Sequence, residues 1–184
     1  IINGAGGVGS VATQLANLAG FTVISTASRS ESIKWTKDHG AKYVVNHRHD
    51  LVKEVRNLGF KYVDYIFELN DLDGHWKEMC ELIRPEGHIV SITENRRPIN
   101  LRLLTKKKAH FSWEWMYSKS YYHTQDMISQ HNILNKISTM LDLGELQSTL
   151  TKSLSPLTSR NLRKAHELVE SGHMIGKVTV SNWQ

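Results

Sequence analysis

The chain has 184 residues, a net charge of +5, 40% hydrophobic residues and 22% charged residues. This length favours one domain with an appendage, and the composition excludes a disordered or fibrous protein. The single cysteine, Cys80, excludes an internal disulfide framework and a multi-cysteine metal site. The single cysteine also fits a reducing compartment, so we expect a cytoplasmic protein. No apolar run reaches the roughly 18 residues of a membrane helix, so we expect no membrane contact.

The first predicted strand is short. Only Ile1–Asn3 precede Gly4, whereas central parallel strands usually contain about five or six residues. The chain also starts without an initiator methionine and without a signal-peptide pattern. We therefore interpret the sequence as a fragment that begins just inside its first strand.

Short apolar runs alternate with amphipathic helices through the first two-thirds of the chain. The runs are predicted as strands over residues 22–26, 42–46, 62–67, 87–93 and 109–115. Each intervening helix ends at a glycine or a Pro-Glu-Gly turn, and Ser28–Glu31 has the spacing of a capping box that opens the second helix. This alternation predicts an α/β fold, a Rossmann-type doubly wound parallel sheet of about six strands with helices on both faces.

The rhythm changes near residue 123. We expect a helix over 124–143, a strand over 148–154, a helix around 162–169 and a last strand over 176–181. This helix-strand-helix-strand arm, residues 124–184, would contain the last helix of the Rossmann domain and a segment that packs on something beyond it. The predicted Rossmann domain itself is then residues 1–123.

A glycine loop follows the first strand. Gly4, Gly6 and Gly9 satisfy the pattern G-x-G-x-x-G directly before an amphipathic helix. The first glycine would allow a tight turn, the second the approach of a pyrophosphate, and the third close packing of helix and strand. The free amides and positive dipole end of the helix would then face the phosphates. The alternative is a plain turn, but the surrounding strands and helices favour a dinucleotide site.

The second strand ends without the acidic residue that an NAD site carries. Ser28 and Arg29 stand there instead, and Arg29 lies twenty residues after Gly9. A carboxylate would repel a 2′-phosphate, whereas serine and arginine can donate hydrogen bonds to it. We therefore predict NADP(H) as the cofactor and residues 1–123 as its binding domain. The alternative for Arg29 is an ordinary exposed residue in the first turn of a helix.

At this point the sequence resembles the medium-chain dehydrogenase/reductase superfamily, in its quinone-oxidoreductase-like branch, which includes zinc-type alcohol dehydrogenase-like proteins. The segments that carry the resemblance are IINGAGGVGS, TVISTASRSE, GAKYVVNHRHDL, VDYIFE, LIRPEGHIVSI and KAHELVESGHMIGKVTV. Together they span nearly the whole chain.

The resemblance implies a GroES-like catalytic domain before Ile1, a C-terminal segment that returns to that domain, and a homodimer made near the 109–115 strand. It also implies a set of cofactor-binding residues. Those near the phosphates and adenosine ribose would be Gly4, Gly6, Gly7, Val8, Gly9, Ser28, Arg29 and His47. Those near the nicotinamide would be Ser91, Ile92, Thr93, Trp113 and Glu114, with Lys177 close to the cleft. Related reductases often carry a tyrosine where this sequence has His47.

Other constellations favour structural roles. His47 and His49 have the spacing of a metal pair, but ten scattered histidines make such a pair unremarkable, and we predict no metal site. The basic stretch Arg96–Lys108 is followed by aromatic residues, which we place in a buried strand, so we predict a solvated face and no nucleic-acid binding. Cys80 lies on the apolar stripe of a helix and is predicted to belong to the core.

The intact protein is therefore expected to be an NADPH-dependent oxidoreductase that transfers hydride to a carbonyl, an enone or a quinone. We assign no catalytic residue to this chain, which alone should bind nucleotide weakly and show little or no turnover. The alternative is a non-catalytic dinucleotide-sensing domain, and a third class is a nucleic-acid-binding protein. A GroES-like barrel before Ile1 would distinguish the enzyme from the sensor.

Overall fold

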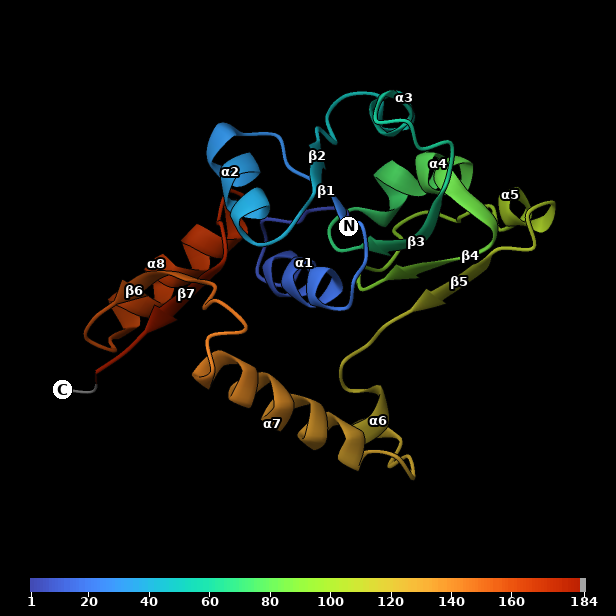
Figure 1. The fold of residues 1–184 in the computed structure, drawn as a ribbon. Coiled ribbons are helices and arrows are strands. Elements are labelled where there is room, and N and C mark those ends of the chain that lie inside the picture. The colour runs from blue at the N-terminus through green and yellow to red at the C-terminus, as the bar shows by residue number, and fades with distance from the viewer. Residues whose placement is uncertain (183–184) are drawn as a thin grey trace.

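The structure is a computed structural model that describes residues 1–182. It alternates strands and helices along the chain as predicted (Figure 1). The strands are β1 Ile24–Thr26, β2 Tyr43–Val45, β3 Val63–Glu68, β4 Ile83–Ser91, β5 His110–Trp113, β6 Leu150–Leu154 and β7 Lys177–Val180. The helices are α1 Gly9–Leu18, α2 Ser30–Asp38, α3 Leu51–Asn57, α4 Leu72–Leu82, α5 Arg102–Thr105, α6 Ser118–Tyr121, α7 Ile128–Asp142 and α8 Ser159–Glu170.

All strand pairs are parallel, but they form three small sheets instead of the predicted single sheet of about six strands. The first sheet contains β1 and β2. The second contains three strands in the order β3-β4-β5, and the third contains β6 and β7. The first two sheets are separated at the segment Ile1–Asn3, which lies between β1 and β3. The Ile1 amino group donates to the carbonyl oxygen of Ile24 in β1, and the Ile2 amide donates to the carbonyl oxygen of Phe67 in β3. Three residues are too few to build a strand ladder, so the sheet is not closed.

The main core lies on one side of β3 and β4, around α4. Met79, Ile83 and Ile89 are completely buried, and Trp76 packs edge-to-face on Phe111. Cys80 is also buried there, as predicted, and burial raises the pKa of its thiol to about 11. The thiol is therefore protonated at neutral pH and has the surroundings of a core residue.

The prediction of a buried fifth strand is wrong. β5 pairs with β4 alone, and among the described residues it forms an edge of the sheet. Trp113 is 53% exposed and Trp115, which follows the strand, is 49% exposed. Periodicity along the sequence does not distinguish an apolar edge strand from a central one, because that difference depends on the neighbouring strands.

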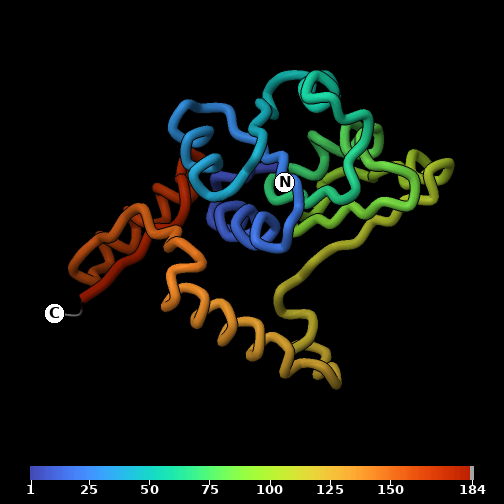
Figure 2. The backbone as a smooth tube through the Cα atoms, in the orientation of Figure 1, coloured from blue at the N-terminus to red at the C-terminus, as the bar shows by residue number. Residues whose placement is uncertain are grey.

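The arm has the predicted order of elements. β6, α8 and β7 form a separate parallel unit that lies beside the start of α1, whereas α7 extends away from the sheet (Figure 2). The predicted helix over 124–143 begins later, at Ile128, and buries no residue. No helix of the described residues is long and apolar enough to cross a membrane.

A cavity of about 620 Å³ adjoins Ile1, between the start of β1 and β3. Its walls are mostly apolar and include Val23, Ile24, Val63 and Tyr65. The amino group of Ile1 lies enclosed at one end of this cavity and donates to the Ile24 carbonyl oxygen at 2.8 Å. Desolvation by burial lowers the pKa of this amino group from 8.0 to about 6.

A chain that begins at Ile1 is therefore expected to gain stability as the pH rises from 6 to 8. The folded state disfavours the protonated amine, so the unfolded state binds more protons in this window and the free energy of unfolding increases with pH. A pKa lowered by two units corresponds to about 2.7 kcal/mol. Urea denaturation between pH 5.5 and 8.5 measures how steeply the free energy of unfolding rises with pH. An N-terminally acetylated chain is the control, and an equal slope in both chains would contradict the assignment.

Candidate cofactor-binding site

The glycine loop leads from the short first strand into α1. Asn3 adopts a left-handed conformation with a φ of 69°, so the turn conformation that we expected of Gly4 belongs to this asparagine. Gly4 is needed for another reason, because a Cβ there would collide with Ser25 Oγ of β1. The Gly4 amide donates to the Thr26 carbonyl oxygen at 3.1 Å. The loop is thus fastened to β1.

The end of this loop presents unused backbone amides. Within residues 1–182, the amides of Gly7 and Val8 donate no hydrogen bond. Gly9 packs so closely on Asn3 and Gly4 that a side chain has no space there. Two free amides and the positive end of α1 suit an anion, and a phosphate group fits this arrangement.

The Gly176–Lys177 pair of the arm lies on the same loop. The Gly176 amide donates to the Ala5 carbonyl oxygen at 2.9 Å. A Cβ built on Gly7 would be 2.8 Å from Lys177 Nζ, so the ammonium group lies directly beside the loop. The tertiary structure therefore brings a positive charge from the far end of the chain to the predicted phosphate position.

Ser28 and Arg29 follow β1 on the same side of the sheet. Arg29 Nη2 donates to the His173 carbonyl oxygen at 2.8 Å, which leaves other guanidinium donors for a ligand. The predicted capping box is wrong: α2 begins at Ser30, its N-cap residue is Arg29, and no side chain caps it. Ser28 lies one residue outside the cap and is free of that role.

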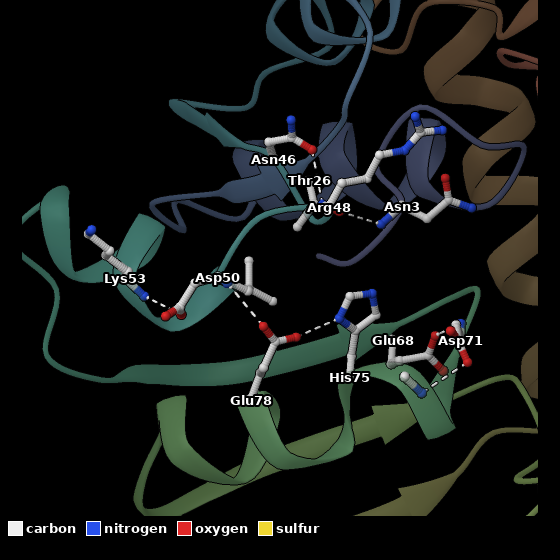
Figure 3. A network of polar contacts seen from close by, with 12 residues as sticks. Asn3, Thr26, Asn46, Arg48, Asp50, Lys53, Glu68, Asp71, His75 and Glu78 are labelled. Atoms are coloured by element: carbon white, nitrogen blue, oxygen red, sulfur yellow. Dashed lines mark hydrogen bonds and ion pairs between the residues drawn. The ribbon is translucent and has the colours of Figure 1, made fainter.

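His47 follows β2 and faces α4. Its ring lies 6.3 Å from the ring of His75, which bonds to Glu78 at 2.7 Å (Figure 3 shows His75 and Glu78). Burial, together with the nearby His75 and Arg48, holds the pKa of His47 below its usual value. Its Nδ1 is buried without a hydrogen-bond partner among the described residues. The imidazole is thus held largely neutral at neutral pH, so it offers a hydrogen bond and not a charge.

The predicted nicotinamide residues lie at the ends of β4 and β5. Ser91 is fully buried and pairs in register with Trp113, so the two strands bring these positions together. Thr93 is half-buried just beyond them. The carboxyl ends of parallel strands meet at one edge of a sheet, which is where the glycine loop also lies.

Two charged residues were missed by sequence reasoning. Lys107 does not belong to a solvated face: its ammonium donates to the carbonyl oxygens of Cys80, Glu81 and Ile83 and so caps the end of α4. Glu68 ends β3 with an exposed fraction of 0% and bonds to Ser91. The available signal was an acidic residue closing an apolar run, which is an unusual place for a charge.

His47 and His49, which have the spacing of a metal pair, do not converge in the structure. His49 bonds to Glu54 and Asn46, whereas His47 faces His75. Within residues 1–182 there is no group of three or more His, Cys, Asp or Glu side chains placed to hold a metal ion. His47 and His49 therefore lie against different partners.

Residues 7–130 match the protein family described as zinc-binding dehydrogenase. The chain belongs to this family. It is the medium-chain family of zinc-type alcohol dehydrogenases and quinone oxidoreductases, as the sequence resemblance indicated. A zinc-type alcohol dehydrogenase-like protein of Staphylococcus aureus is 42% identical over 181 residues, which are 98% of this chain and 54% of the relative.

Solved structures of related proteins have the same fold as this chain. A Rhizobium etli protein assigned to the zinc-dependent alcohol dehydrogenases superposes with a TM-score of 0.95 at 38% identity, over 100% of this chain and 54% of the other. The quinone oxidoreductase of Escherichia coli, solved with NADPH, has a TM-score of 0.78 at 21% identity, over 97% of this chain and 55% of the other. The chain spans about half the length of the relatives it matches.

Proposed function

We propose that this chain is the NADP(H)-binding part of an oxidoreductase that reduces a carbonyl, an enone or a quinone. The observation that carries the proposal is the glycine loop, where the Gly7 and Val8 amides donate no hydrogen bond within residues 1–182 and Lys177 Nζ lies beside Gly7. The NADPH named for the Escherichia coli structure supports the same cofactor. We assign substrate contacts and catalytic groups to residues outside this chain, and the working unit to a homodimer.

In this proposal the residues of the chain bind and orient the cofactor. Gly6, Gly7 and Val8 hold the pyrophosphate, with Lys177 neutralising its charge, and Ser28 and Arg29 bind the 2′-phosphate. His47 lies beside the adenosine ribose, and Thr93 and Trp113 form a wall beside the nicotinamide, with Ser91 buried behind them. When bound, NADPH supplies a hydride from C4 of its nicotinamide ring. The chain's own contribution is therefore binding, orientation and exclusion of water from one face of that ring.

Arg29→Ala is expected to weaken NADPH binding by about ten- to a hundredfold while changing NADH binding by less than about threefold. A charge-assisted hydrogen bond contributes roughly 1.5–3 kcal/mol, and only NADPH carries the 2′-phosphate that receives it. Fluorescence titration with both nucleotides measures the ratio of the two affinities.

Arg102→Ala is the matched control, because it removes the same charge from exposed α5, at the far end of the sheet (Figure 1). Arg29→Ala also removes the hydrogen bond from Arg29 to the His173 carbonyl oxygen. This loss affects the binding of both nucleotides and therefore cancels in the ratio of NADPH to NADH affinity. An unchanged ratio of NADPH to NADH affinity in Arg29→Ala would overturn the assignment of the 2′-phosphate site.

A further inference from the structure

Glu68 is a buried acidic side chain whose four hydrogen bonds come from two separate loops. Its Oε1 accepts from the amides of Asn70 and Asp71, both at 2.5 Å. Its Oε2 accepts from Ser91 Oγ at 2.7 Å and from Thr93 Oγ1 at 2.6 Å. Among the described residues no cation bonds to it, so neutral donors alone compensate its burial. Figure 3 shows Glu68 beside Asp71 at the end of β3.

These bonds join the start of α4 to the end of β4 and the residues that follow it. Asn70 and Asp71 form the turn that opens α4, and the side chain of Asp71 caps that helix through the Gly74 amide at 3.0 Å. Ser91 and Thr93 also bond to each other, because the Thr93 amide donates to Ser91 Oγ at 3.1 Å. One carboxyl group thus holds the turn and the segment in a single arrangement.

The backbone of Glu68 lies next to the glycine loop. Glu68 pairs with Ile2 in the parallel register, two residues before Gly4. Its carbonyl oxygen accepts from the Ile92 amide at 3.2 Å. Glu68 therefore stands between the strand that carries the phosphate loop and the segment proposed to contact the nicotinamide.

We infer that Glu68 is a positioning residue that fixes Ser91–Thr93 for the nicotinamide half of the cofactor. The inference rests on the proposed NADP(H) function and adds a residue to it. A segment that is already ordered before binding loses less conformational entropy when the ligand arrives. Arg29 and the free amides of the glycine loop do not bond to the Glu68 side chain, so we expect a change of that side chain to leave the adenosine half of the site in place.

The test compares two ligands on the same chain by calorimetry. NADPH contains both halves of the cofactor, whereas adenosine 2′,5′-bisphosphate contains only the adenosine half. Glu68→Gln keeps the size of the side chain and replaces one acceptor oxygen by a donor. We expect it to weaken NADPH binding by on the order of tenfold, which equals about 1.4 kcal/mol, and to leave bisphosphate binding within about twofold.

Fluorescence of the bound nicotinamide gives a second readout, and we expect its enhancement to fall in Glu68→Gln. Glu78→Gln is the matched control, because Glu78 is a half-buried glutamate on α4 that bonds to the Leu51 amide and to His75. It should leave the nicotinamide fluorescence unchanged. Thr93→Val removes one of the four bonds without introducing a new donor and covers the case in which Glu68→Gln does not fold.

The two variants also form a double-mutant cycle. If Glu68 acts through Thr93, their combined effect on NADPH affinity is smaller than the sum of the single effects. Equal weakening of both ligands, or an unchanged NADPH affinity in Glu68→Gln and Thr93→Val, would overturn the positioning role. Failure of the unaltered chain to bind either ligand would instead overturn the proposed function, on which this role depends.

Discussion

Gly9→Ala is expected to lower the free energy of unfolding by about 3 kcal/mol and to abolish NADPH binding. A Cβ at this position would meet the Asn3 carbonyl oxygen, and it would lie 2.7 and 2.8 Å from the Cα and carbonyl carbon of Gly4. All three are backbone atoms, and they are held in place: the Asn3 amide donates to Thr26 Oγ1 at 2.9 Å and the Gly4 amide to the Thr26 carbonyl oxygen. Urea denaturation and calorimetric titration with NADPH measure the two effects.

Gly6→Ala separates stability from cofactor binding in the same loop. Its Cβ would meet only the side chain of Asn3, with the nearest atom, Nδ2, at 3.0 Å, and that side chain can turn away. The free energy of unfolding should change by less than about 1 kcal/mol, although the extra methyl group would lie at the position proposed for the pyrophosphate. If Gly9→Ala were as stable as Gly6→Ala, the close packing of α1 on the first strand would not be essential.

Adding three valines before Ile1 is expected to raise the free energy of unfolding by about 3 kcal/mol. The hydrogen bonds of Ile1 and Ile2 to β1 and β3 define a strand path that continues into the apolar cavity of about 620 Å³. Burial of each valine contributes roughly 1.5–3 kcal/mol and each new backbone hydrogen bond about 1 kcal/mol. Ordering each residue costs about 1–2 kcal/mol, so the net effect stabilises the chain.

An extension of the same length with the sequence Gly-Asn-Gly is the control, since it can fill the path but buries little apolar surface. Thermal and urea denaturation of both extended chains measure the difference. The valine extension should also remove the contribution of the Ile1 amino group to the pH dependence of stability between pH 6 and 8, because Ile1 then has no free amino group. Equal stability of the two extended chains would show that the cavity does not accept a strand.

The order of elements and the position of the glycine loop could be predicted from local patterns. Apolar runs, helical stripes and terminal glycines depend only on neighbouring residues, so β1 to β3 and α1 to α4 lie close to where they were expected. β4 begins at Ile83 and not at residue 87, so it includes the Pro-Glu-Gly segment that was predicted as a turn. The exposure of Trp113 and the role of Lys107 could not be predicted in this way. Both depend on which distant segment lies beside them, namely β4 alone for Trp113 and the end of α4 for Lys107.

By itself, the sequence determined that a glycine loop precedes an amphipathic helix, that no acidic residue follows the second strand, and that the repeated units form parallel strands. Only the tertiary structure decided that Lys177 and His173 of the arm reach the loop and Arg29, and that Glu68 connects Ser91 and Thr93 to the start of α4. The physical reason is sequence separation. Helix and turn signals act over a few residues, whereas a site at the carboxyl edge of a parallel sheet is assembled from loops that are distant along the chain.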